Sequence, residues 1–269
     1  MKIGFIGAGN MANALMTGLK NNKSISKTDV FVADTDVSRL TYIKNQYGFN
    51  VSQNNDEVIN SASDILFLCI KPQVFDEIAS ELKKVIKKEQ IVVSIMAGKS
   101  IEYLSGGLST KNIVRVMPNT PCLASAGICA VATNDEIKKD ERFEVILDIL
   151  KGAGEAEVVD EKYINAITQV SGASPAWVFM MIEALADGGV ECGMSRDMAY
   201  KFATNAVYGA GKLAVDKYNE NKTHPGVLKD MVTSPAGTTI EGVRVLEENG
   251  FRGAVIDAVL ASYARSLEL

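Results

Sequence analysis

The stretch KIGFIGAGNMANAL, residues 2–15, decides the fold class of this chain. A short apolar run leads into a turn with Gly7 and Gly9, and a helix-forming segment begins near Asn10. Gly7 permits a tight turn, and Gly9 lets the backbone come close to a pyrophosphate, which the N–H groups of a helix N-terminus can bind. Ala12 replaces the third glycine of this pattern and is small enough for close packing of helix on strand. The stretch predicts a dinucleotide site; the alternative is a purely structural turn.

Outward from this turn, short apolar runs alternate with helix-forming segments up to about residue 160. Rich in Val and Ile, the runs read KIGFI, VFVA, DILFLCI, IVVSIM, IVRVM and GICAVA. We expect helices at 11–19, 75–86 and 136–150, the last preceded by Thr133 and Glu136 in capping-box spacing. Strands that alternate with helices predict an α/β fold with a doubly wound, mostly parallel sheet. Residues 1–160 are therefore expected to form a Rossmann-like dinucleotide-binding domain.

Strand-like runs disappear after about residue 160, and long segments at helical period replace them. Residues 175–194 and 197–215 are apolar on more than one side. Such helices must be covered on nearly all sides, and a helical half of this size has too little interior to cover two of them. We therefore expect residues 161–269 to form an all-α domain whose helices are covered by a second subunit.

The composition excludes several classes of partner. A net charge of −5 over 269 residues disfavours nucleic acid or an anionic membrane, because those need clustered Lys and Arg. The four cysteines show no metal-ligand spacing and are expected to be reduced, and the single histidine, His224, builds no histidine-based site, so we expect no metal. The N-terminus lacks the regions of a signal peptide, and no run reaches about 18 apolar residues, which predicts a cytoplasmic protein.

Asp34 ends the second apolar run, VFVAD. A carboxylate at this place accepts hydrogen bonds from the adenosine ribose and repels a 2′-phosphate, which favours NADH over NADPH. The alternative is a cap for the helix that begins near Asp36. Arg39 can also reach a 2′-phosphate, so NADPH stays open.

Later strand ends carry further candidate contacts, because doubly wound sheets bind ligands outside the carboxyl ends of their strands. Lys71, in CIKPQ (69–73), can donate to a cofactor phosphate or ribose, although a solvated lysine is the alternative. MAG (96–98) and VMPNTP (116–121) end two more runs. Asn119 stands between two prolines, in a stiff loop from which it can contact nicotinamide or substrate.

Two polar stretches of the helical half contain helix starts. In SGASPAW, Ser174 is expected as N-cap and Pro175 as the first helical residue. In TSPAGTTIEG, Thr238 and Glu241 form a T-x-x-E capping box for a helix that ends near Gly250. The N–H groups at this second start suit a carboxylate or a phosphate, and an ordinary cap is the alternative.

Groups for nucleophilic or metal-assisted catalysis are missing from the sequence. It contains no GxSxG or HExxH motif. Hydride transfer needs mainly a cofactor and an oriented acceptor, and a protonated imine needs little acid assistance. The absence therefore favours a reductase over a hydrolase.

Seven blocks follow one another along the chain. They read GFIGAGNMA, FLCIKPQ, VRVMPNTP, VSGASPAWVF, EALADGGVECGM, HPGVLKDMVTSPAGTTIEG and LEENGFRGAVIDAV. In this order, and over essentially the whole chain, they closely resemble the pyrroline-5-carboxylate reductase family, with 224–242 as the most specific part. The resemblance implies reduction of Δ1-pyrroline-5-carboxylate to L-proline by NADH or NADPH, the last step of proline biosynthesis.

The resemblance also implies an assembly and a site. In that family the helical half forms an intertwined homodimer, often built into a ring of dimers. The substrate lies between the nicotinamide and a loop that matches residues 234–239, contributed in part by the partner chain. Carried over by position, the backbone around Gly237 and Thr238 would bind the substrate carboxylate, and the Thr239 hydroxyl would bond the ring nitrogen.

Thr239 is therefore the expected catalytic residue. The expected substrate-binding residues are Ser234, Gly237, Thr238, Thr239, Asn119 and Ser174. The expected cofactor-binding residues are Ile6, Gly7, Ala8, Gly9, Asn10, Met11, Asp34, Asn55, Cys69, Ile70, Lys71, Pro72, Met96 and Ala97.

Two residues depart from the family pattern. Ser174 stands where the family usually has glycine in SGSGPA, and Ala236 stands where it has the first glycine of SPGGTT. Both residues are small, but Ala236 would be strained if its position needs φ above zero. These departures bear on substrate preference more than on the reaction.

Two other functions are compatible with parts of this sequence. A β-hydroxyacid dehydrogenase shares the plan of a Rossmann domain followed by helices but wants a lysine on the early interdomain helix, and 171–183 contains none. A non-catalytic dinucleotide sensor would bind NAD(H) and ignore the imine, which would leave the loop at 224–242 without a purpose.

Overall fold

The computed structural model describes residues 1–21 and 25–268. Within it the chain divides into two compact units, residues 1–173 together with the last residues from Ser266, and Ser174–Arg265. The strands are β1 (Ile3–Ile6), β2 (Val30–Ala33), β3 (Asn50–Ser52), β4 (Ile65–Leu68), β5 (Ile91–Ser94), β6 (Ile113–Met117), β7 (Gly127–Thr133) and β8 (Gly154–Val158). The helices of the first unit are α1 (Asn10–Asn21), α2 (Val37–Tyr47), α3 (Asn55–Ser61), α4 (Pro72–Val85), α5 (Ile101–Leu108), α6 (Glu141–Lys151) and α7 (Ile164–Ile167).

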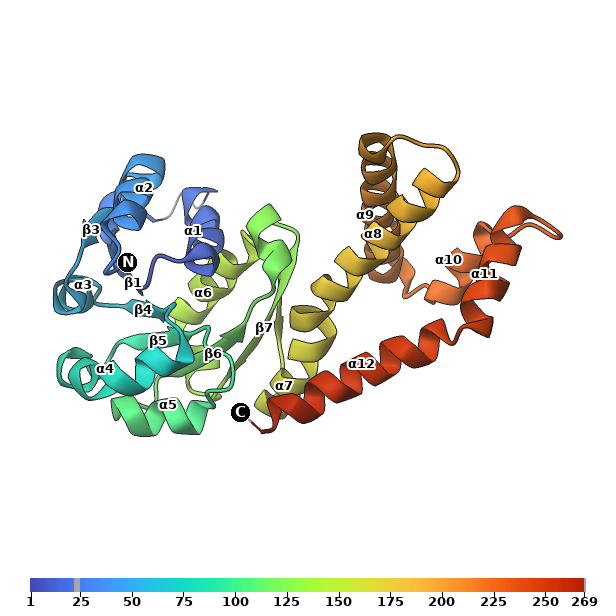
Figure 1. The fold of residues 1–269 in the computed structure, drawn as a ribbon. Coiled ribbons are helices and arrows are strands. Elements are labelled where there is room, and N and C mark those ends of the chain that lie inside the picture. The colour runs from blue at the N-terminus through green and yellow to red at the C-terminus, as the bar shows by residue number, and fades with distance from the viewer. Residues whose placement is uncertain (22–24, 269) are drawn as a thin grey trace. The chain divides into compact units, whose positions relative to one another are not determined.

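The first unit is built around one eight-stranded sheet (Figure 1). The strand order is β3-β2-β1-β4-β5-β6-β7-β8, and all neighbouring strands are parallel except β6 and β7. The first six positions have the doubly wound order in which the chain starts at the centre and works outward twice. The expected α/β fold with a mostly parallel sheet is confirmed.

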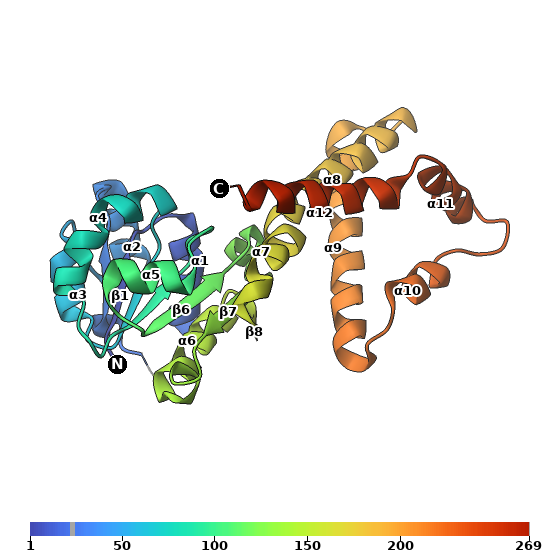
Figure 2. The ribbon, with the colours of Figure 1, turned by 90° about the horizontal axis from the view of Figure 1, so that it is seen from below.

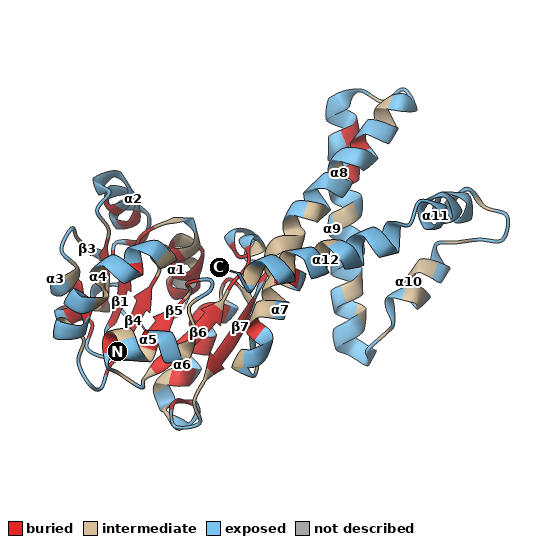
Figure 3. Ribbon diagram, turned by 60° about the horizontal axis from the view of Figure 1, so that its bottom comes forward, coloured by how far each residue is buried: buried red, intermediate tan, exposed pale blue. Residues whose placement is uncertain are grey.

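Helices cover both faces of this sheet, because side chains of successive strand residues point to opposite faces. Ile3 and Phe5 pack in one core with residues of α1, α2 and α6. Ile6 packs in a second core with residues of α3, α4 and α5. Figure 2 shows α4 and α5 side by side, and Figure 3 shows the buried residues concentrated along the strands. The strands β1, β4 and β5 are buried along their whole length, as the continuous apolar runs predict.

The second unit is entirely helical, as expected for this half of the chain. It consists of α8 (Ser174–Glu191), α9 (Arg196–Asn221), α10 (Pro225–Met231), α11 (Thr238–Glu248) and α12 (Phe251–Ser266), the last of which ends one residue beyond it. Its buried core consists only of Ala186, Ala199 and Ala203, on α8 and α9. Large apolar side chains on these two helices are exposed, among them Phe179, Met180, Leu185, Phe202 and Tyr208.

Two strands of the sheet, β3 and β8, were not predicted from the sequence. β3 has only three residues, which are polar or partly exposed, and β8 reads GEAEV and is largely exposed. Both lie at the edges of the sheet, where one side of a strand has no neighbour and little apolar burial is required.

The helix expected at 136–150 is wrong in its start. Residues 137–139 form the short 3₁₀ helix η3 (Ile137–Lys139), and α6 begins only at Glu141. The side chain of Asp140 caps α6 by accepting from the Arg142 N–H at 2.9 Å, whereas the Thr133 hydroxyl donates to the carbonyl of Ile113. Aspartate is among the strongest N-caps, so the later cap determines where the helix begins.

Ser174 is not an N-cap either. The chain is helical from Ile164, and the π-helix η5 (Thr168–Ala173) leads directly into α8, whose first residue is Ser174. A proline at 175 has no N–H to give and would clash with the carbonyl of residue 171 in a regular α-helix. A wider π turn accommodates that misfit, so Pro175 marks a bulge inside a helix rather than a start.

The capping box at Thr238 and Glu241 is also wrong, although α11 does begin at Thr238. Its N-cap is Gly237, which has no side chain with which to make a cap hydrogen bond. Glu241 instead accepts from the Arg244 guanidinium at 3.0 Å. The first N–H groups of α11 are therefore not satisfied by a capping side chain.

Candidate functional site

The glycine turn after β1 has the conformation that its sequence predicts. Gly7 has φ of +100°, and its N–H donates to the carbonyl of Ala33 at 2.7 Å. A Cβ at Gly7 would lie 2.5 Å from the carbonyl oxygen of Cys69. Glycine is therefore required here both by the backbone conformation and by the close approach of the β4 loop.

Gly9 and the start of α1 leave room for a ligand. A Cβ at Gly9 would meet no atom within 4 Å, so the protein itself does not use the space that this glycine leaves. The first helical hydrogen bond runs from the Asn13 N–H to the carbonyl of Gly9 at 2.9 Å. The N–H groups of Asn10 and Met11 belong to the first turn, where a helix has no acceptors of its own. This cradle fits the pyrophosphate of a dinucleotide.

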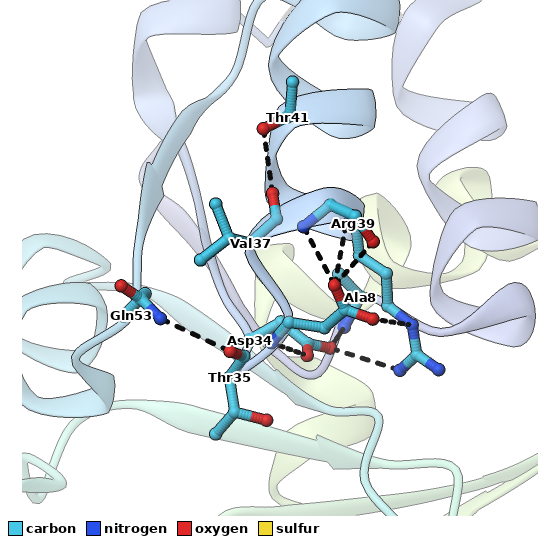
Figure 4. Close-up of polar contacts among 9 residues, drawn as sticks. Ala8, Asp34, Thr35, Val37, Arg39, Thr41 and Gln53 are labelled. Carbon is cyan, nitrogen blue, oxygen red and sulfur yellow. Dashed lines mark hydrogen bonds and ion pairs between the residues drawn. The ribbon is translucent and has the colours of Figure 1, made fainter.

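The Asp34 carboxylate links the glycine turn to the end of β2 (Figure 4). Its Oδ2 accepts from the Ala8 N–H at 2.7 Å, and its Oδ1 accepts from the Asp36 N–H at 2.9 Å. The Arg39 Nη1 lies 3.7 Å from Oδ2, and the Asp34 side chain is only 9% exposed. Asp36, and not Asp34, caps α2, since its side chain accepts from Ser38 and Arg39. The hydrogen bond from the Ser38 side chain lowers the pKa of Asp36.

Other expected cofactor residues lie at the carboxyl ends of neighbouring parallel strands. The Cys69 N–H donates to the carbonyl of Ile6 at 2.8 Å, which holds the β4 loop against the glycine turn. Lys71 is the exposed N-cap of α4 and Pro72 its first residue. The structure thus brings one group of the expected residues to a single edge of the sheet. This group comprises Ile6, Gly7, Ala8, Gly9, Asn10, Met11, Asp34, Asn55, Cys69, Ile70, Lys71, Pro72, Met96 and Ala97.

Two of these residues differ sharply in exposure. Met96 follows β5 and is buried at 2% exposure, whereas its neighbour Ala97 is exposed. Asn55 is the first residue of α3 and is partly exposed beyond β3.

Burial raises the pKa of the Cys69 thiol, so this cysteine is a neutral packing residue at the edge of the sheet.

Asn119 lies at the end of β6 with its amide committed to the protein. Its Nδ2 donates to the carbonyl of Ser171 at 3.1 Å, and its Oδ1 accepts from the Ile128 N–H at 3.0 Å. The Cys122 Sγ lies 3.5 Å from the same Oδ1. Sequence reasoning missed Ser171 as a partner; the signal that points to it is Pro175, four residues on, which cannot donate to its carbonyl.

All four cysteines are free thiols. The Sγ atoms of Cys122 and Cys129 are 3.9 Å apart, and the hydrogen bond between them lowers the pKa of Cys122 to about 7. Across residues 1–21 and 25–268, no group of three or more His, Cys, Asp or Glu side chains is arranged to hold a metal ion. Over the same residues, helices that combine the length and apolar character of a membrane span are absent.

The remaining expected residues belong to the loop before α11 in the second unit. The Gly237 N–H donates to the carbonyl of Ser234 at 3.1 Å, which closes a tight turn. A Cβ at Gly237 would lie 2.3 Å from the Ser234 Oγ. Ser234, Thr238 and Thr239 are exposed within this unit. The uncapped first turn of α11 therefore presents backbone N–H groups beside three hydroxyl groups.

Ala236 has φ of +56° in this loop. The position does need the left-handed conformation, so the strain foreseen for an alanine is present. A residue with a Cβ pays about 1–2 kcal/mol for this conformation.

Replacing Ala236 with glycine should therefore stabilise the protein. We expect the free energy of unfolding to rise by roughly 0.5–1 kcal/mol, because relief of the left-handed strain exceeds the extra chain entropy of glycine. Denaturant unfolding of the assembled protein measures the change. Ala254→Gly, in the helix α12, is the matched control and should destabilise by about 1 kcal/mol. Equal destabilisation by both substitutions would contradict the strain at Ala236.

Comparisons with known proteins cover both units. Residues 161–269 match the family model described as pyrroline-5-carboxylate reductase dimerisation, and residues 2–98 match the one described as NADP oxidoreductase coenzyme F420-dependent. The pyrroline-5-carboxylate reductase of Escherichia coli (strain K12) is 43% identical over 269 residues, which is 100% of this chain and 98% of the relative.

Solved structures agree with these matches. A pyrroline-5-carboxylate reductase from Coxiella burnetii superposes with a TM-score of 0.89 at 29% identity, covering 99% of this chain and 97% of its own. The NADP-bound pyrroline carboxylate reductase of Plasmodium falciparum superposes with a TM-score of 0.83 at 30% identity, with the same coverage of both chains.

A doubly wound sheet with an open glycine turn, followed by a helical unit, defines the class of Rossmann-type oxidoreductases with a helical C-terminal region. The extent of the match to the relative from Escherichia coli defines the family within that class. The chain belongs to the pyrroline-5-carboxylate reductase family.

Proposed function

We propose that this chain reduces Δ1-pyrroline-5-carboxylate to L-proline with NADH or NADPH, the last step of proline biosynthesis, in the cytoplasm. The observation that carries the proposal is the uncapped start of α11, where Gly237 leaves the first N–H groups of the helix open beside Thr238 and Thr239. A small carboxylate is the ligand that such a helix start attracts. The substrate of this family carries one beside its imine.

The cofactor is proposed to lie along the carboxyl edge of the sheet. The N–H groups at Gly9, Asn10 and Met11 would hold its pyrophosphate, and Asp34 would accept from the adenosine ribose. Lys71, exposed at the N-cap of α4, would donate to a phosphate or to the nicotinamide ribose. The open space at Gly9 supports this arrangement, because a methyl group there would occupy the path of the pyrophosphate.

The substrate is proposed to bind at the loop before α11. The backbone around Gly237 and Thr238 would hold its carboxylate through the N–H groups of the first turn of α11, since the Gly237 N–H itself already donates to Ser234. Ser234 and Ser174 would lie at the margin of the site. The Thr239 hydroxyl would bond the ring nitrogen and orient the imine carbon. The bound cofactor supplies the hydride that this carbon accepts. The protein's task is then positioning, since the imine nitrogen takes up a proton without a strong acid from the chain.

A homodimer through the helical unit is part of the proposal, with a ring of dimers as the larger assembly that the family resemblance implies. The exposed apolar side chains of α8 and α9 support it, because isolated soluble subunits rarely expose so many. We further propose that the loop at 234–239 completes the site of the partner chain. A cofactor-bound structure of the assembled protein tests this ownership, and a loop that faces the nicotinamide of its own chain would refute it.

The cofactor preference is expected to be for NADH and to depend on Asp34. Asp34→Ser should shift the ratio of kcat/KM for NADH to that for NADPH towards NADPH by about tenfold or more, because about 1.4 kcal/mol of charge repulsion corresponds to a factor of ten. Asp29→Ser is the matched control, since Asp29 precedes the opposite end of β2, and it should leave the ratio unchanged. A wild-type protein that strongly prefers NADPH would show that this interpretation of Asp34 is wrong.

The proposed reaction is tested with the purified wild-type protein. Reduced nicotinamide absorbance should fall only when the cyclic imine is added, with NADH, NADPH or both. Absence of turnover with either cofactor would reject the proposal. Tight cofactor binding without any binding of a carboxylate-bearing proline analogue would favour the sensor function instead.

A further inference from the structure

Asn119 ties three separate segments of the first unit together through one side chain. Its amide bonds the π-helix η5 at Ser171 and the start of β7 at Ile128, while its backbone continues from β6. The side chain is buried, with 9% exposure for the whole residue. A Cβ at Gly127 would lie 2.6 Å from Oδ1 of Asn119, so β7 can approach the amide only because residue 127 is glycine. The packing around this amide leaves no room for a side chain at position 127.

The bond to Ser171 supplies a donor that the helix itself lacks. In an α-helix the carbonyl of residue 171 would accept from residue 175, and a proline stands there. The Asn119 Nδ2 donates to this carbonyl at 3.1 Å. The Ser171 hydroxyl is engaged elsewhere, donating to the carbonyl of Ile167 at 2.9 Å. Asn119 thus stabilises the helical run at the point where Pro175 interrupts its bonding.

A second contact holds the beginning of the same helical run against β6. The Arg115 guanidinium donates to Glu161 at 3.0 Å and to the Asn165 side chain at 3.2 Å. Residues 161–173 are therefore attached to one strand at two levels, by Arg115 within the strand and by Asn119 beyond its carboxyl end. Only the second attachment lies at the edge where doubly wound sheets bind their ligands.

We propose that Asn119 is a positioning residue for the reduction, and that it acts by fixing the π-helical turn η5 beside the nicotinamide end of the cofactor. The inference rests on the proposed function. In a doubly wound sheet the two halves of a dinucleotide lie on the two sides of the central strand, so the adenosine end lies near β2 and the nicotinamide end lies towards β5 and β6. The turn η5 borders that second side, since a Cβ at Gly172 would lie 3.8 Å from the Met117 side chain at the end of β6.

The test replaces the Asn119 amide group that donates to the Ser171 carbonyl. Asn119→Asp keeps the oxygen that accepts from Ile128 but places a carboxylate oxygen against the carbonyl of Ser171. At about pH 8 we expect kcat to fall by about a hundredfold, the loss that a displacement of roughly 1 Å in a reacting geometry can cause. The protonated acid can donate again, and its burial beside a carbonyl raises its pKa. The ratio of mutant to wild-type kcat should therefore recover about tenfold by about pH 5.5.

Controls separate positioning from loss of structure. Asn119→Ala has no donor at any pH, so its kcat ratio should stay low throughout the same range. Cys122 is the titratable side chain in contact with the amide, and Cys122→Ser should keep wild-type kcat and pH dependence. Amide hydrogen exchange of residues 168–173 should be faster in Asn119→Ala than in the wild type and unchanged in Cys122→Ser.

Each possible result either supports or overturns the proposed role of Asn119. A loss of kcat in Asn119→Asp that is constant with pH would show a merely structural role and overturn it, as would wild-type activity in Asn119→Asp. A wild-type protein that fails to turn over the imine would instead reject the proposed function. In that case faster exchange in residues 168–173 of Asn119→Ala would still establish that Asn119 holds the turn η5 in place. Unchanged exchange would refute it.

Discussion

Replacing Thr239 with valine is expected to lower kcat for imine reduction by about a hundredfold. The exchange is nearly isosteric and removes only the hydroxyl that the proposal places on the ring nitrogen. A hydrogen bond that strengthens in the transition state of a water-excluded site contributes roughly 10²–10³ in rate. Threonine and valine have similar helix propensities, so the first turn of α11 should form in both. Steady-state kinetics with saturating cofactor measures the change.

Thr239→Ser is the matched control for this prediction. It retains the hydroxyl and removes only the methyl group, so its kcat should stay within about fivefold of the wild type. Cofactor affinity should be unchanged in both variants, because the glycine turn belongs to the other unit. If Thr239→Val works within about threefold of the wild-type kcat, Thr239 is not the residue that orients the imine.

Replacing Gly7 with alanine is expected to abolish cofactor binding and to destabilise the first unit. Its φ of +100° is unfavourable for any residue with a Cβ, and that Cβ would lie 2.5 Å from the carbonyl oxygen and 2.8 Å from the carbonyl carbon of Cys69. The Cys69 N–H donates to the carbonyl of Ile6, so these backbone atoms cannot move away cheaply and we expect a loss of about 3 kcal/mol in unfolding free energy. NADH affinity, followed by fluorescence titration, should fall by more than about a hundredfold.

Gly9→Ala separates the contribution of the glycine turn to stability from its contribution to cofactor binding. A Cβ at Gly9 meets no protein atom within 4 Å, so its unfolding free energy should stay within about 0.5 kcal/mol of the wild type. The methyl group would nevertheless stand in the proposed path of the pyrophosphate, and NADH affinity should fall by about tenfold or more. Normal NADH affinity in Gly9→Ala would place the cofactor somewhere other than at this turn.

The parts of the fold that the sequence predicts are those in which local chemistry and burial agree. KIGFI and IVVSIM are continuous apolar runs because their strands are buried on both faces. The turn at Gly7 was predictable because only glycine suits its conformation. Strain at Ala236 was predictable on the same ground, and its φ of +56° confirms that its position needs φ above zero.

The parts that escaped prediction depend on contacts between distant residues. Pro175 indicates that the Ser171 carbonyl lacks its helical donor, but no local pattern identifies Asn119, more than fifty residues earlier, as the replacement. Likewise Pro175 has the signature of a helix start, and only the preceding helical run makes it a π bulge. At α6 the capping-box spacing of Thr133 and Glu136 points to an earlier helix start, although Asp140 is the stronger cap residue and determines the observed one.

The most direct test of the account follows the transferred hydrogen. The purified protein is incubated with the cyclic imine and with NADH or NADPH that carries two deuterium atoms at nicotinamide C4, and the product is analysed by mass spectrometry and NMR. We expect L-proline with a single deuterium at the ring carbon that was doubly bonded to nitrogen. Cofactor oxidation without labelled proline, or no oxidation at all, would contradict it.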